Sequence, residues 1–261
     1  MSNQENNAEK NNRIVEKEDK KEYEKKIFLS NFAEEKLKRY EDQMTFLEDL
    51  FKTNKNELSK EERNLLSIAY KNNISLIRDA IQNILSFESQ ESKKPESPYL
   101  KYIKEYKNIL QQKLEELCNK IINTIKNNFL PAKMSDEGKI FFHNIIGDYY
   151  RYMAETADVD TFKKYREKSL ESYDIAFNLA EKLDYKDPLR LGLVLNLSIF
   201  YYDIDKNTEK ACTLAEDIIS KSKNEIINGD EEEDEDKDAK YILKFLEENL
   251  AKWKSKELDK S

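Results

Sequence analysis

Apolar residues recur every three or four positions along most of this chain, which is the spacing that buries one face of an α-helix. The pattern is weak before Tyr23 and then continues almost to the C-terminus, interrupted by short polar stretches. It predicts an all-α fold of nine helices packed as an antiparallel array. The expected segments are two short helices between Tyr23 and Phe51, followed by 59–87, 98–130, 135–153, 159–183, 187–204, 208–227 and 237–253.

Polar residues at the predicted helix starts support these boundaries. Ser59 and Glu62 have the spacing of a capping box, in which each side chain bonds the backbone N–H of the other residue. Ser97-Pro98 and Asp187-Pro188 each place a capping side chain before a proline in the first turn. Pro131 is expected to end the long helix that precedes it.

One domain, residues 27–256, is expected between two polar ends. Residues 1–26 are rich in Asn, Glu and Lys and predict a polar, flexible N-terminal extension, while residues 257–261 form a short C-terminal tail. Residues 229–237 predict an acidic loop before the last helix. Four Gly and four Pro in 261 residues are too few for a sandwich, a barrel or an open α/β sheet.

The charge pattern narrows the choice of partners. Charged residues of both signs are interleaved and the net charge is −8, which argues against nucleic acid as the main partner. The chain has no run of about 18 apolar residues, and its N-terminus lacks the apolar stretch of a signal peptide. We therefore expect a cytoplasmic protein with no membrane insertion.

Catalytic chemistry has little support in the sequence. His143 is the only histidine, so sites that need imidazole partners are largely excluded and a structural role is expected for it. Cys118 and Cys212 have no metal or redox spacing and are expected to be reduced packing residues. The chain also lacks a Gly-rich phosphate loop. We expect no catalytic residues, no metal and no cofactor, and therefore not an enzyme.

Four residues have the chemistry needed to bind a phosphate group. Lys71 and Arg78 are seven positions apart, so they lie on one face of a predicted helix, and Arg151 and Tyr152 lie on a later helix. Such side chains can surround the oxygens of a phosphate with charge-assisted bonds of about 1.5 to 3 kcal/mol each. Taken alone, however, a Lys and an Arg on a helix are usually solvated surface charges.

Two later helices carry apolar stripes that are each interrupted by an asparagine. The first stripe contains Leu195, Asn196 and Ile199, and the second contains Ile242, Phe245, Leu246, Asn249 and Trp253. An isolated stripe of this kind usually packs into the core. The alternative is the wall of a groove for an extended peptide.

Three segments closely resemble those of the 14-3-3 protein family: residues 63–72 read RNLLSIAYKN, residues 148–152 read DYYRY and residues 190–196 read RLGLVLN. The resemblance covers about residues 27–256. It implies nine helices around a concave groove that binds phosphoserine or phosphothreonine segments of client proteins. It also implies that Lys71, Arg78, Arg151 and Tyr152 bind the phosphate, that Asn196 and Asn249 bind the peptide backbone, and that Leu195, Ile199, Ile242, Phe245, Leu246 and Trp253 form the apolar wall.

The sequence also departs from the family pattern. Where the family has a further arginine one turn beyond Arg78, this chain has Gln82, which removes one positive charge, and the family leucine before Trp253 is Lys252. Asp148 is retained and is expected to hold neighbouring basic side chains in place. The leading hypothesis is a phosphopeptide-dependent adaptor that regulates signalling. The alternative is a divergent scaffold that binds phosphopeptides weakly or not at all, acting through phosphate-independent contacts or blocked by its own tail.

The resemblance further implies a dimer, in which the first helix of one subunit contacts the third and fourth helices of the other. Where the family has a glutamate facing the arginine that matches Arg39, this chain has Lys113, and a family lysine is replaced by Ile109. We therefore expect an interface held by apolar contacts, in a homodimer or in a heterodimer with another 14-3-3 subunit. The expected contacts come from Leu29, Phe32, Ala33 and Leu110.

Overall fold

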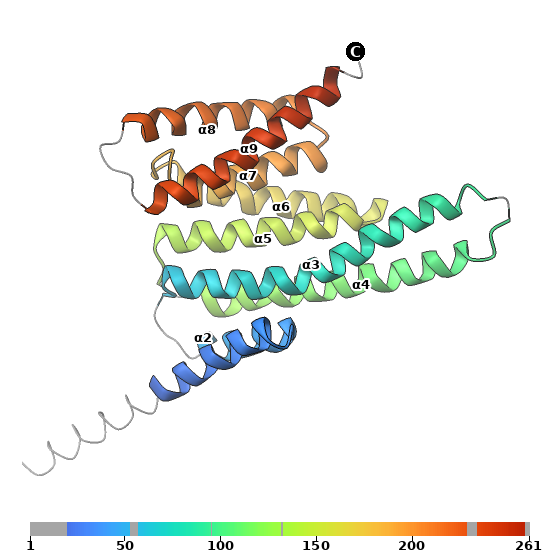
Figure 1. The fold of residues 1–261 in the computed structure, drawn as a ribbon, viewed down its shortest axis with the longest axis horizontal. Helices are drawn as coiled ribbons and strands as arrows, with labels where there is room; N and C mark the ends of the chain where they lie inside the picture. The colour runs from blue at the N-terminus through green and yellow to red at the C-terminus, as the bar shows by residue number, and fades with distance from the viewer. Residues whose placement is uncertain (1–19, 53–56, 95, 132, 229–233, 259–261) are drawn as a thin grey trace, which may run out of the picture. The chain divides into compact units, whose positions relative to one another are not determined.

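The computed structural model describes residues 20–52, 57–94, 96–131, 133–228 and 234–258, and over these residues the chain is helical with no strand (Figure 1). The predicted all-α fold with nine α-helices is therefore confirmed for this part of the chain. The helices are 20–35, α2 (Tyr40–Lys52), α3 (Lys60–Glu91), α4 (Leu100–Thr124), α5 (Asp136–Thr156), α6 (Val159–Ala180), α7 (Pro188–Asp203), α8 (Thr208–Asn228) and α9 (Asp234–Leu258), with a π-helical turn, η1 (Ile125–Phe129), after α4.

The chain divides into two compact units, residues 1–79 and residues 80–261, with the boundary inside α3. In the first unit, the helix 20–35, α2 and the start of α3 are linked by partly buried polar contacts. The carboxylate of Glu34 accepts hydrogen bonds from Gln43 Nε2 of α2 (2.6 Å) and from Asn72 Nδ2 of α3 (3.1 Å). Asn73 Nδ2 donates to the carbonyl of Tyr40 at 2.6 Å. The core of this unit contains Ala33, Met44, Leu47, Phe51, Leu66, Ala69, Tyr70 and Ile74.

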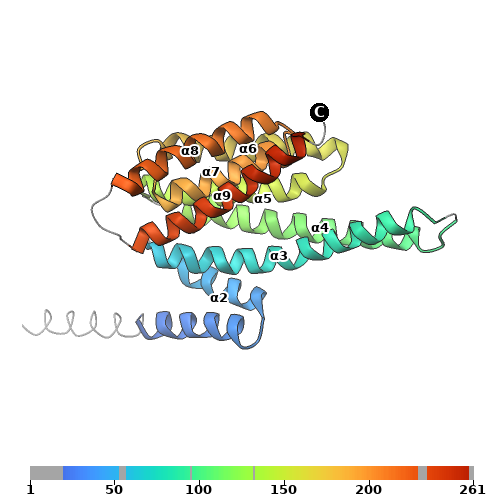
Figure 2. The same ribbon diagram turned by 45° about the horizontal axis from the view of Figure 1, so that its top comes forward.

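The second unit is a stack of antiparallel helices. In it α5 packs against α4, α6 and α7, and α9 packs against α7 and α8 (Figures 1 and 2). Many of the apolar residues that the sequence places at helical spacing point into this stack. Fully or almost fully buried side chains include Leu114, Ile121, Phe142, Ile146, Tyr173, Leu193, Phe200, Ala215 and Leu246.

A glycine fixes how closely α5 and α6 pack. A Cβ atom placed on Gly147 of α5 would lie 2.6 Å from ring atoms of Tyr173 of α6, which is too close for any residue larger than glycine. Ser169 Oγ of α6 donates to the carbonyl of Gly147 at 2.8 Å. The ring of Tyr173 therefore lies directly against the α5 backbone, and this contact fixes the position of the Tyr173 hydroxyl group.

Three predicted helix starts are confirmed in atomic detail. At the start of α3, Ser59 N–H donates to Glu62 Oε2 (2.8 Å) and Glu62 N–H donates to Ser59 Oγ (3.2 Å), which completes the capping box. Ser135 caps α5 by accepting from the N–H of Gly138. Asp187 caps α7, with Pro188 in the first turn.

Other boundaries differ from the prediction. The helix expected to run unbroken to Leu130 becomes π-helical over Ile125–Phe129, just before Pro131. Ser97 was expected to cap the same helix, but α4 begins at Leu100 and its N-cap residue, Tyr99, makes no side-chain cap. Proline at position 98 lies two residues before this start, so the cap geometry expected from proline in the first turn does not form.

The predicted boundaries at the two ends of the domain also differ from those in the structure. Residues 20–26 belong to the first helix, although they were expected in the polar extension, and the rest of that extension lies outside the described residues. Helix α9 begins at Asp234, so part of the predicted acidic loop, 229–237, belongs to the helix. Acidic residues are favourable in a first helical turn because of the positive end of the helix dipole. Helix α9 also extends to Leu258, into the predicted tail.

Both cysteines are buried and free, as predicted, and burial raises the pKa of the Cys212 thiol. Among the described residues, no helix is long and apolar enough to cross a membrane.

Candidate functional site

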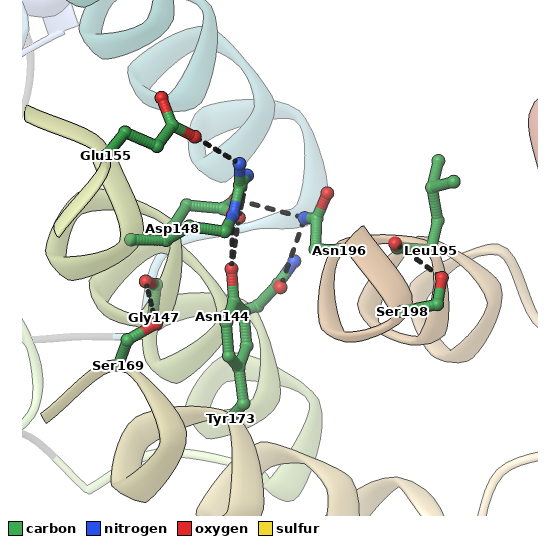
Figure 3. Close-up of polar contacts among 10 residues, drawn as sticks. Asn144, Gly147, Asp148, Glu155, Ser169, Tyr173, Leu195, Asn196 and Ser198 are labelled. Carbon is green, nitrogen blue, oxygen red and sulfur yellow. Dashed lines mark hydrogen bonds and ion pairs between the residues drawn. The ribbon is translucent and has the colours of Figure 1, made fainter. Parts of the chain in front are cut away.

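The best-defined polar cluster of the second unit is built around Arg151 on α5. Asp148 and Glu155 lie three positions before it and four after it, which places all three side chains on one face of the helix. Arg151 Nη2 lies 2.9 Å from Asp148 Oδ1, and Nη1 lies 3.0 Å from Glu155 Oε1 (Figure 3). The guanidinium is therefore held between two carboxylates of its own helix.

Tyr173 of α6 ties this cluster to the neighbouring helix. Its hydroxyl donates to Asp148 Oδ1 at 2.6 Å and accepts from Arg151 Nε at 3.1 Å. Burial and the charge of Asp148 raise the pKa of Tyr173 well above its usual value, so the hydroxyl keeps its proton as a donor to Asp148. One hydroxyl thus fixes the positions of both the carboxylate and the guanidinium.

Asn196 of α7 adds a third helix to the cluster. Its Nδ2 donates to Asp148 Oδ2 at 3.0 Å and to Asn144 Oδ1 at 3.2 Å, which engages both amide hydrogens (Figure 3). Its Oδ1 can still accept a hydrogen bond from a ligand N–H. To donate to a ligand, Asn196 has to release one of these two partners.

The electrostatics favour a permanently charged guanidinium. Arg151 is only 5% exposed, and burial alone lowers its pKa, but Tyr173, Tyr152, Asp148 and Glu155 raise it well above the usual value overall. The guanidinium also lies 4.6 Å from the centre of the Tyr152 ring, in a cation–π contact. Two carboxylates outnumber this single cation, so a phosphate dianion needs further positive groups to bind here.

Residues 31–254, which include this cluster, match the family model described as 14-3-3 protein. The chain belongs to the 14-3-3 family. The checkpoint signal transducer rad25 of Schizosaccharomyces pombe is 36% identical over 233 residues, which cover 89% of this chain and 85% of the relative. The 14-3-3 protein 3 of Entamoeba histolytica is 37% identical over 235 residues, covering 89% and 96%. The 14-3-3-like protein A of Glycine max is 36% identical over 234 residues, covering 89% and 90%.

Membership of the 14-3-3 family confirms the resemblance seen in the sequence and supports an adaptor role in signalling. The divergent scaffold that has lost phosphopeptide binding is not favoured. The family consists of non-enzymatic adaptors that bind client proteins and dimerise.

The other two predicted phosphate ligands lie in the first unit. Lys71 is exposed, whereas Arg78 is half-buried, and both belong to the same helix, α3. Their role in phosphate binding stays a prediction from the 14-3-3 resemblance. Gln82, which replaces a family arginine, is exposed on the part of α3 that belongs to the second unit.

The residues predicted to form the apolar wall divide into two groups. Leu195 and Ile199 on α7 and Ile242 on α9 are half-buried, as is Asn249, and Phe245 is 39% exposed, so all of these present surface to solvent. Leu246 is completely buried and Trp253 is 6% exposed, stacked on Tyr202 with ring centroids 5.0 Å apart. These two side chains serve mainly as core, which places them poorly for contact with a ligand.

A polar cavity of about 540 Å³ lies elsewhere in the second unit, between α4, the end of α5 and the start of α6. Its walls include Gln111, Glu115, Asp158 and Tyr165, and none of the predicted site residues lines it. The Tyr165 hydroxyl bonds the Glu115 carboxylate across this cavity.

Sequence reasoning missed three members of the Arg151 cluster. Glu155 and Asn144 could have been found, because each lies four positions from a predicted member on the same helix. Tyr173 could not, because its role depends on how α6 packs against Gly147, and no local spacing shows that contact.

Proposed function

We propose that this protein is an adaptor that binds phosphoserine- or phosphothreonine-containing segments of client proteins, with Arg151 as a direct phosphate ligand. The observation that supports this proposal is that the guanidinium of Arg151 is held in a fixed position. Three of its five N–H groups are engaged, by Asp148, Glu155 and Tyr173, which leaves two for a ligand. A guanidinium that is already oriented loses little side-chain freedom when a phosphate binds.

The phosphate requires more positive charge than this cluster supplies. Lys71 and Arg78 are proposed to provide it, together with a hydrogen bond from the Tyr152 hydroxyl, on the strength of the family resemblance. Because Gln82 contributes no charge, we expect weaker phosphate attraction than in relatives that have arginine at this position. The proposed adaptor role does not depend on a positive charge at position 82.

The peptide around the phosphate is proposed to lie along α7 and α9. Asn196 Oδ1 and the side-chain amide of Asn249 can bond its backbone, as the resemblance implies. Leu195, Ile199 and the exposed ring of Phe245 offer apolar surface for side chains next to the phosphorylated residue. The proposed location of the protein is the cytoplasm.

Fluorescence anisotropy of a labelled peptide tests this function. The peptide carries phosphoserine in an Arg-rich context with proline two residues later, and its matched control is the unphosphorylated twin. We expect the phosphorylated form to bind far more tightly than its twin, and added salt to weaken its binding because charged groups dominate the contact. Equal affinity for the two twins would overturn the proposal in favour of phosphate-independent binding.

We also propose that the protein dimerises through exposed apolar side chains, either with itself or with another 14-3-3 subunit. At the N-cap of α4 and along the helix, Tyr99, Tyr102, Tyr106 and Ile109 recur at helical spacing and are 64%, 65%, 56% and 47% exposed. In the first unit, the exposed rings of Phe28 and Phe32 stack with centroids 5.9 Å apart. Both faces suit the contacts that the family makes between subunits.

The charge reversal at Lys113 is less harmful than the sequence suggested. Arg39, the expected partner of that position, already bonds both oxygens of Asp42 in its own chain, at 2.9 and 3.1 Å. Ile109→Glu should raise the dimer dissociation constant at least tenfold in sedimentation equilibrium, because it places a charge within an apolar face. Lys113→Glu, the matched control, should change it little, and a dimer unaffected by Ile109→Glu would contradict an apolar interface.

A further inference from the structure

The connection between α3 and α4 contains a sequence signal that the adaptor function does not use. The four prolines of the chain follow Lys94, Ser97, Leu130 and Asp187, so Ser97 is the one serine or threonine that directly precedes a proline. Residues 96–99 lie outside both helices, with Pro98 and Tyr99 exposed and Ser97 half-buried. The ends of α3 and α4 that join here project past α5 (Figures 1 and 2).

The hydroxyl of Ser97 lies at the centre of a small polar network. Ser97 Oγ donates to Glu91 Oε1 at 2.5 Å, and the other carboxylate oxygen, Oε2, lies 2.7 Å from Lys94 Nζ. The two partners together lower the pKa of Glu91, with Lys94 the larger cause. Ser97 Oγ also accepts from the backbone N–H of Tyr99 at 3.2 Å. The Glu91 carboxylate therefore ties the end of α3 to the segment that leads into α4.

The backbone around Ser97 favours rearrangement. Glu96 has a φ angle of 56°, in the left-handed region that is unfavourable for residues with a Cβ atom. An extended conformation at Glu96 would relieve this strain, and Ser97, the residue before Pro98, already prefers an extended backbone. Extension of the Ser97-Pro98 segment would also expose the half-buried Ser97, as a protein kinase requires of its substrate.

We propose that Ser97 is a phosphorylation site for a proline-directed protein kinase, and that the phosphate breaks the link between Ser97 and Glu91. In the reaction, Ser97 Oγ forms a bond to the γ-phosphorus of ATP, the bond between that phosphorus and the β,γ-bridging oxygen breaks, and ADP leaves. The hydroxyl proton passes to the catalytic base of the kinase. Phosphorylated Ser97 therefore has no hydroxyl hydrogen to donate to Glu91.

The added charge then rearranges the connection. A phosphate of about −1.5 to −2 charge beside the Glu91 carboxylate repels it and attracts Lys94 away from it. The phosphate also lies just before the start of α4, where Tyr99 provides no side-chain cap and the positive end of the helix dipole favours an anion. Phosphorylation should open residues 92–94 and 96–99 and strengthen the first turn of α4.

The test is phosphorylation of the full-length protein by a purified kinase of the mitogen-activated type, followed by mass spectrometry. We expect one phosphate, located on Ser97, and none on the Ser97→Ala variant. Pro98→Ala keeps the hydroxyl and should also lose incorporation, which shows that the kinase reads the Ser-Pro pair. Absence of phosphate at Ser97 in the folded protein would overturn the proposal, whether or not a peptide of residues 92–104 is phosphorylated.

Hydrogen exchange of the phosphorylated protein tests the structural consequence. Amides in 92–99 should exchange faster and those in the first turn of α4 more slowly than in the unmodified protein. Glu91→Gln is the matched control, because its amide oxygen still accepts from Ser97 but has no charge for the phosphate to repel, so the increase in 92–99 should be much smaller. An equal increase in this variant would contradict the role given to Glu91. Neither experiment involves the proposed phosphopeptide site, so each can fail or succeed independently of it.

Discussion

The Arg151 cluster and the outer face of α9 were both predicted as parts of one binding groove, yet they are built in opposite ways. In the cluster, side chains from α5, α6 and α7 bond one another, and the central guanidinium is almost fully buried. On α9, the predicted stripe divides between core and surface, and Phe245 packs edge-on against the exposed ring of Tyr241, with centroids 4.8 Å apart.

The difference follows from the kinds of interaction involved. Hydrogen bonds and ion pairs depend on direction and distance, so a polar site must be held in place before the ligand arrives. Apolar contact is non-directional and depends mainly on the area buried. This agrees with the comparison to the family pattern: the cluster retains Asp148, Arg151 and Asn196, whereas α9 has Lys252 in place of a family leucine. We infer that the Arg151 cluster, the polar side of the proposed groove, determines whether a client binds. The apolar side, on α9, then determines which clients are preferred.

The largest effect is expected from Arg151→Ala. Removal of this buried cation leaves Asp148 and Glu155 facing each other without compensation, which should destabilise the fold by about 3–5 kcal/mol. Phosphopeptide affinity should fall by about 10- to 150-fold, since a charge-assisted contact worth about 1.5–3 kcal/mol is lost. Urea denaturation measures the first loss and anisotropy the second. An unchanged affinity in protein shown to be folded by circular dichroism would remove Arg151 from the site.

A pair of adjacent substitutions on α9 separates core from surface. Leu246→Ala should lower the free energy of unfolding by about 2–5 kcal/mol, because it creates a cavity at a completely buried position. Phe245→Ala should cost far less stability but should weaken peptide binding. If urea denaturation gave similar losses for both variants, the division of the stripe described above would be wrong.

Two glycine substitutions test the packing that positions Tyr173. Gly147→Ala brings a Cβ atom to 2.6 Å from the Tyr173 ring and should cost about 1–3 kcal/mol, with weaker phosphopeptide binding because the hydroxyl moves. Gly192→Ala is the control: a Cβ there meets nothing within 4 Å, so the helix should gain about 0.5–1 kcal/mol. Thermal unfolding should therefore shift in opposite directions, and a shift in the same direction would contradict this account of Gly147.

The smallest change removes a single oxygen. Tyr173→Phe keeps the ring against Gly147 but deletes the hydroxyl that bonds Asp148 and Arg151, at a cost of about 1–3 kcal/mol for the buried groups left unbonded. Affinity for the phosphorylated peptide should fall several-fold, while the unphosphorylated twin should be unaffected. Identical phosphopeptide affinities for Tyr173→Phe and wild type would mean that Asp148 and Glu155 orient the guanidinium without help.

Much of the fold could be predicted because its signals are local. The capping residues Ser59, Ser135 and Asp187 mark helix starts by bonds that reach only two or three residues along the chain. The π-helical turn before Pro131 was not predicted, because a one-residue change in hydrogen-bond register leaves no mark on the apolar spacing. The start of α9 was placed too late because its first acidic residues were interpreted as loop.

The candidate site was likewise predictable only where its contacts are local in the sequence. Asp148 and Arg151 were predicted as partners because they share a helix, and the structure confirms that contact at 2.9 Å. Tyr173 and the burial of Leu246 and Trp253 depend on the positions of neighbouring helices, and a single sequence does not contain that information. The family resemblance supplied residue identities, but it could not show which members of a stripe turn toward the core.

The central claim is that a client phosphate contacts the guanidinium of Arg151, and a thermodynamic cycle tests it most directly. Calorimetry gives four affinities: wild type and Arg151→Lys, each with the phosphorylated peptide and with its unphosphorylated twin. Lysine keeps one charge but lacks the planar fork, so the phosphate and Arg151 should show a coupling energy of about 1 kcal/mol or more. A coupling near zero, with both proteins discriminating equally between the twins, would mean that the phosphate is bound elsewhere and would contradict the account.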